Sequence, residues 1–148
     1  MAVIWQKHVS GKHYQVRSAG ATRRLYCNGV FHSQFNSRTP LTGHTWDLLM
    51  IPAFFLPREA LRRVLVLGVG GGTVIRQLQY FFSPQIIIGI ECNPVHLYLA
   101  RRFFGIGGKG VSLRKADAVQ WLTDYSGKRF DMIIDDLFGD EEGDGARA

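Results

Sequence analysis

Glycines followed by a helical pattern give this sequence the mark of a cofactor-binding turn. The branched apolar run 64–67 stops abruptly at four glycines, and a helical pattern starts at Thr73; the glycines are Gly68, Gly70, Gly71 and Gly72. Glycine lets a backbone turn tightly and approach a ligand closely. A helix that starts directly afterwards presents free N–H groups and a partial positive charge. The spacing departs from the dinucleotide pattern G-x-G-x-x-G/A, because Thr73 occupies the last position.

Acidic residues follow each of the next three predicted strands. Glu91 ends the apolar run 86–91, about 20 residues beyond the glycines, where a βαβ unit places an acid against ribose hydroxyls. Asp117 follows the run 111–115, and Asp135 and Asp136 follow the run 130–134. Successive side chains of a strand point to opposite sides, so one acid of the last pair faces the site. Because ligands bind at the carboxyl ends of parallel strands, these acids predict one site.

The motifs together resemble the S-adenosylmethionine-dependent transferases, and most closely their spermidine synthase-like branch. The resemblance rests on the glycine turn, Glu91 followed by Asn93-Pro94, Asp117-Ala118, the run 130–136 and the small β-region around Asn28-Gly29. It implies a donor site in which the turn holds the methionine end, Glu91 the ribose, and Asp117-Ala118 the adenine. The cofactor would be S-adenosyl-L-methionine or its decarboxylated form. The implied cofactor-binding residues are Gly68, Val69, Gly70, Gly72, Glu91, Cys92, Asp117 and Ala118, and the implied catalytic acids are Asp136 and Asp140.

Structural roles compete with these assignments. Glu91 could be a solvated strand end, and Asp117 could cap a helix, a role compatible with binding adenine. Cys92 and His96 lie four residues apart, but two ligands make no metal site, and we expect none.

Two departures from the family pattern bear on the reaction. Aminopropyltransferases carry a Tyr-His-Glu-like triplet at the positions of residues 44–47, which this chain lacks. They also carry a D-x-x-D-P-like motif where this chain has Asp136-Leu-Phe-Gly-Asp140. We therefore expect a spermidine synthase-like methyltransferase with an unknown small-molecule acceptor, an amine being one candidate. Aminopropyl transfer from decarboxylated S-adenosylmethionine is the alternative. A non-catalytic cofactor-binding or assembly module is the third.

The expected fold is α/β, with a doubly wound, mainly parallel Rossmann-like sheet truncated after its fourth strand. Residues 1–40 predict an antiparallel β-region with strands near 3–9, 14–17 and 24–27 and a hairpin turn at Asn28-Gly29. Residues 41–148 predict the cofactor-binding domain, with helices over 45–51, 73–82, 94–103 and 118–124. The family's sheet has seven strands, so we expect either a fragment of a longer gene product or a second chain on the exposed edge.

Charge and composition limit the partners. The net charge of +6 lies mainly in residues 1–63, where the basic residues are scattered, which does not favour nucleic acid. No apolar run reaches the roughly 20 residues of a membrane span, and the N-terminus has no signal-peptide pattern. The two cysteines lie far apart in the sequence, which favours reduced thiols and therefore a cytoplasmic protein. From the resemblance we expect a homodimer.

Overall fold

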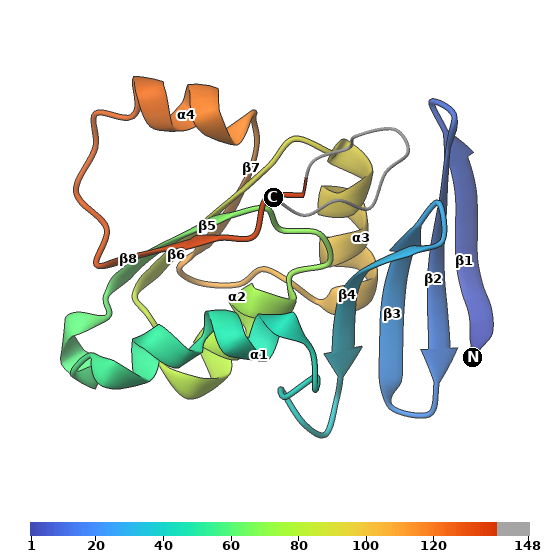
Figure 1. Ribbon diagram of the computed structural model, residues 1–148, viewed down its shortest axis with the longest axis horizontal. Coiled ribbons are helices and arrows are strands. Elements are labelled where there is room, and N and C mark those ends of the chain that lie inside the picture. The colour runs from blue at the N-terminus through green and yellow to red at the C-terminus, as the bar shows by residue number, and fades with distance from the viewer. Residues whose placement is uncertain (139–148) are drawn as a thin grey trace.

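Two four-stranded sheets form the framework of the computed structural model, which describes residues 1–138 (Figure 1). The first sheet is an antiparallel meander in the order β1-β2-β3-β4. Its strands are Ala2–Val9 (β1), Lys12–Ala19 (β2), Thr22–Cys27 (β3) and Val30–Asn36 (β4). Asn28 and Gly29 both have positive φ, 48° and 80°. A two-residue turn of this kind matches the twist of the strands, so the predicted hairpin is confirmed.

The second sheet is parallel, in the order β7-β6-β5-β8. Its strands and helices alternate as Arg63–Leu67 (β5), Thr73–Phe81 (α2), Ile86–Glu91 (β6), Pro94–Phe104 (α3), Val111–Lys115 (β7), Ala118–Asp124 (α4) and Met132–Asp135 (β8). This alternation confirms the doubly wound, Rossmann-like fold expected from the sequence.

Two apolar clusters cover the two faces of the parallel sheet. The larger contains Val64 and Val66 of β5, packs against α2 and α3, and continues into the antiparallel sheet through Val16 and Leu25. The smaller contains Leu65 and Leu67 of β5 together with Ala118 of α4. Alternate residues of β5 thus face opposite helical layers, which is why this strand is apolar along its whole length. The shared core fixes the position of the antiparallel sheet against α3.

The segment before β5 differs from the single helix expected over 45–51. The α-helix α1 spans only Thr45–Leu49, and short 3-10 helices follow at Ile51–Phe55 (η1) and Arg58–Ala60 (η2). Pro52 lies in the first turn of η1, where its missing N–H is tolerated. His44 occupies the N-cap position of α1, and its side chain makes no capping hydrogen bond. Instead the Asp47 carboxylate accepts hydrogen bonds from the N–H groups of Thr42 and Gly43.

Strand β8 forms one edge of the parallel sheet within the described residues. Ile133 of this strand is 53% exposed, so the edge is apolar, as expected for a sheet that ends at its fourth strand. No helix within residues 1–138 is long and apolar enough to cross a membrane. The homodimer stays a prediction.

Candidate functional site

The glycine turn between β5 and α2 approaches two other elements closely. A Cβ on Gly68 would lie 2.2 Å from the backbone oxygen of Asp136, just beyond β8. A Cβ on Gly70 would lie 2.9 Å from Ser33 Oγ and 3.1 Å from the His32 carbonyl oxygen, both in β4. Both glycines also have positive φ, 82° and 53°. Only glycine satisfies these two conditions, so the turn is built to bring three segments together.

Glu91 is bonded to this turn in the structure. Its Oε2 accepts hydrogen bonds from the N–H groups of Val69 (3.1 Å) and Gly70 (2.9 Å), and its Oε1 accepts one from Asn93 N–H (2.9 Å). Burial raises the pKa of Glu91, but the neighbouring His96 and the hydrogen bonds from the N–H groups of Gly70 and Asn93 outweigh it and lower the pKa to about 2. The carboxylate is therefore charged and holds the turn in place. Its assignment to the ribose stays a prediction.

Asp117 caps a helix and lines the cavity, and its assignment to adenine stays a prediction. It is the N-cap of α4, where its Oδ1 accepts a hydrogen bond from Gln120 N–H at 2.8 Å. It also lines the same cavity as Glu91, together with Ala118. Capping satisfies one free N–H of the helix and leaves the second carboxylate oxygen for a ligand.

Asp136, the residue directly after β8, lines this cavity, whereas Asp135 is exposed. The indole Nε1 of Trp46 in α1 donates a hydrogen bond to Asp136 Oδ2 at 3.1 Å. Burial raises the pKa of Asp136 to about 6, and the charges of Asp135 and Glu91 add to this, against the Trp46 hydrogen bond. A carboxyl group whose pKa lies near neutrality in a cleft is suited to holding or moving a proton.

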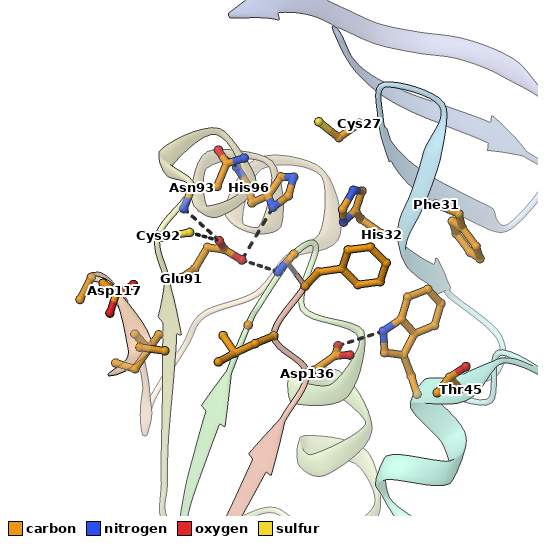
Figure 2. Close-up of a pocket in the computed structure, with 18 of the residues that line it drawn as sticks. Cys27, Phe31, His32, Thr45, Glu91, Cys92, Asn93, His96, Asp117 and Asp136 are labelled. Carbon is orange, nitrogen blue, oxygen red and sulfur yellow. Dashed lines mark hydrogen bonds and ion pairs between the residues drawn. The ribbon is translucent and has the colours of Figure 1, made fainter. Parts of the chain in front are cut away.

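The carboxyl ends of β5, β6, β7 and β8 open on one cavity of about 520 Å³ (Figure 2). Of the residues predicted for the site, the cavity is lined by Gly68, Gly70, Glu91, Cys92, Asp117, Ala118 and Asp136. Val69 and Gly72 do not line it: Val69 contributes its N–H to Glu91, and Gly72 lies against the side chain of Ile106. Asp140 lies outside the described residues.

Several cavity residues were not predicted from the sequence. They come from the antiparallel sheet, from α1 and from the segment after β8: Cys27, Phe31, His44, Trp46, Leu137 and Phe138. The ring of Phe31 packs edge-on against Trp46 at 5.1 Å between centroids. The sequence predicted the hairpin at Asn28-Gly29, where β3 ends and β4 begins, but not that it lies beside the site, and the aromatic side chains carried no local signal.

Comparisons with known proteins agree with this geometry. A polyamine aminopropyltransferase of Ralstonia nicotianae is 32% identical over 122 residues, which are 77% of this chain and 23% of the relative. Another, from Caldanaerobacter subterraneus subsp. tengcongensis, is 29% identical over 100 residues, 66% of this chain and 33% of the relative. A probable spermidine synthase from Corynebacterium glutamicum superposes with a TM-score of 0.77 at 18% identity, covering 97% of this chain and 55% of that structure. The chain is spermidine synthase-like.

A methyltransferase-like structure is also similar to this chain. Human methyltransferase-like protein 13 in complex with SAH superposes with a TM-score of 0.57 at 22% identity, over 68% of this chain and 50% of that one. No family model matches the chain. The chain spans about a quarter to a third of the length of the curated relatives that it matches. These relatives are transferases, and they support the aminopropyltransferase alternative better than the methyltransferase expected from the two motif departures.

Proposed function

We propose that the cavity binds decarboxylated S-adenosylmethionine and serves aminopropyl transfer to a small amine. The observation that carries this proposal is the charge of the cavity wall. Glu91, Asp117 and Asp136 line the cavity, and within the described residues neither Lys nor Arg does. Decarboxylation leaves a donor with a sulfonium and an ammonium but no carboxylate. A wall with three acids favours that dication over S-adenosylmethionine, whose carboxylate has no basic side chain to pair with.

The size and lining of the cavity fit an adenosyl group. A volume of about 520 Å³ lies in the range of small-molecule sites. Ile90, Ala118 and Val119 offer apolar surface beside the polar Asp117. Gly68 and Gly70 line the cavity with backbone alone, so a ligand can approach the turn closely.

Asp136 is the residue we assign to the ammonium ends of the substrates. Trp46 holds one of its carboxylate oxygens, so the other can receive a cation. When bound, the donor would supply a carbon activated by its sulfonium: an amine would attack this carbon in line while its bond to sulfur breaks, and the sulfur would leave as a neutral thioether. Asp136 would orient the amine and accept its proton as the new bond forms, a role that requires the charged carboxylate. The cavity aromatics Phe31 and Trp46 would add cation–π contact.

Calorimetric titration with the two donors tests the proposal. One unpaired carboxylate about 8 Å from an acid costs on the order of 2 kcal/mol at an effective dielectric constant near 20. The decarboxylated donor should therefore bind about 30-fold more tightly than S-adenosylmethionine.

Asp136→Asn should reduce this preference, whereas Asp124→Asn at the exposed end of α4 should keep it. Tighter binding of S-adenosylmethionine would favour the methyltransferase instead. No binding of either donor by folded protein would favour a non-catalytic module.

A further inference from the structure

Three side chains that the proposed donor site leaves unused meet at the end of the cavity near the antiparallel sheet. They are Cys27 of β3, His32 of β4 and His96 of α3, and their potential ligand atoms all lie within 4.8 Å of one another. All three line the cavity. Figure 2 shows His32 and His96 side by side, with Cys27 on the strand beyond them, and the two imidazole rings are 5.0 Å apart between centroids.

The fold explains why these residues converge. Asn28 and Gly29 turn β3 directly into β4, which pairs Cys27 with Val30. The pairing of β3 with β4 shifts register between Leu25 and Tyr26, which leaves His32 as the extra residue of a β-bulge. A bulge re-aims a side chain, and the His32 ring lies beside His96 at this end of the cavity. The shared core packs α3 against this sheet, which brings His96 to the same end. The convergence is tertiary, since 64 residues separate His32 from His96 in the sequence.

His96 carries the second, independent observation. Its side chain is buried, with the residue 7% exposed, and within the described residues its Nε2 has no hydrogen-bond partner. Its Nδ1 lies 3.7 Å from Glu91 Oε2, and Tyr14 packs edge-on against its ring at 5.7 Å. A buried polar nitrogen without a partner is costly and needs an explanation. A carboxylate on one nitrogen that leaves the other for a metal is the usual surrounding of a metal-binding histidine.

We propose that Cys27, His32 and His96 bind a zinc ion whose fourth coordination position opens into the cavity. One thiolate and two imidazoles suit Zn²⁺, and three protein ligands with an open fourth position are typical of catalytic rather than structural zinc. In a tetrahedral site the sulfur and nitrogen ligands lie about 3.5 Å apart, given Zn–S near 2.3 Å and Zn–N near 2.0 Å. Side-chain rotations that close the present separations by about 1 Å complete the site.

The proposed site differs from the pair that the sequence spacing suggested. Cys92 and His96 lie four residues apart in the sequence, but Cys92 precedes α3, is exposed and is not part of the cluster. The thiolate of Cys27 and the charge of Glu91 beside His96 would together balance the two charges of the zinc ion. The open position would take water or a neutral amine. This proposal does not depend on the identity of the donor.

Cobalt substitution tests the site directly. The whole chain, stripped of metal by a chelator, is titrated with Co²⁺ and then with Zn²⁺. We expect one metal per chain, the visible bands of tetrahedral cobalt and the near-ultraviolet band of a thiolate–cobalt bond, both abolished by zinc. Wild-type protein without these bands would overturn the proposal, whatever its donor affinity.

Matched variants locate the ligands. Cys27→Ser should remove the thiolate band, whereas Cys92→Ser, at the other cysteine, should keep it. His32→Gln and His96→Asn should weaken binding, whereas His44→Gln, which changes a cavity histidine outside the cluster, should not. Glu91→Gln should keep the band and lower the affinity about 10- to 100-fold. A thiolate band that survives Cys27→Ser but disappears in Cys92→Ser would refute the assignment. If Cys27→Ser does not fold, His32→Gln, which changes a half-buried residue, tests the site instead.

Discussion

Asp136→Asn should stabilise the folded protein at neutral and alkaline pH, although it removes a residue we assign to catalysis. Burial beside Asp135 and Glu91 holds the pKa of Asp136 at about 6, against an ordinary value of 3.8. The folded state therefore disfavours the charged carboxylate. Asparagine has nearly the same shape, carries no charge, and keeps an oxygen that can accept the Trp46 hydrogen bond.

The size and sign of the effect follow from proton linkage. Between pH 3.8 and about 6 the unfolded chain has lost the Asp136 proton while the folded chain keeps it. Stability from this group is therefore complete below pH 3.8, falls as the pH rises to about 6, and stays low above that. Because one pKa unit corresponds to about 1.4 kcal/mol, the charged carboxylate costs the folded state about 3 kcal/mol. Asp136→Asn should recover most of this above pH 7 and nothing near pH 3.

Urea unfolding followed by circular dichroism at pH 3.5, 5 and 8 measures this difference. Asp135→Asn is the matched control, since it removes a charge from the exposed neighbour and should change the free energy of unfolding by at most about 0.5 kcal/mol. The reasoning would be refuted if Asp136→Asn were less stable than wild type at pH 8. It would also be refuted if the two proteins differed in free energy of unfolding by the same amount at all three pH values. Greater stability with lost donor preference would mark Asp136 as a residue kept for function.

Three further substitutions test the geometry around the cavity. Gly68→Ala should lower the free energy of unfolding by at least about 1 kcal/mol more than Gly11→Ala, because both have φ near 80° but only Gly68 would push a Cβ against backbone; equal losses in urea titrations would argue against the close approach. Asp117→Ala should cost about 1 kcal/mol through the lost helix cap, whereas Asp117→Asn should cost much less; thermal unfolding of the pair distinguishes a cap from a charge effect. Trp46→Phe should raise the pKa of Asp136 further by removing the indole donor, which an NMR titration of that carboxyl carbon measures; an unchanged or lower pKa would contradict the hydrogen bond.

Most of the parallel sheet could be predicted because its signals are local. The apolar runs, the glycine turn at Gly68 and the N-cap at Asp117 each depend on residues close in sequence, and the structure places all of them as expected. The segment after residue 44 was predicted less well, because Pro52 and the bonds of Asp47 to the preceding loop replaced a simple helix. Gly72 illustrates another limit: its role is packing against Ile106, which the motif alone does not distinguish from ligand contact.

Which acids end the parallel strands could be deduced from the sequence, because strand direction and the rule that ligands bind at carboxyl ends need no knowledge of distant contacts. What surrounds those acids depends on contacts between segments that are far apart in the chain. Trp46 reaches Asp136 across 90 positions, and His96 meets Cys27 and His32 because two sheets share one core. The pKa of Asp136 and the cluster near the antiparallel sheet both depend on burial and charge contributed by remote segments, so neither could be deduced from the motifs in which these residues lie.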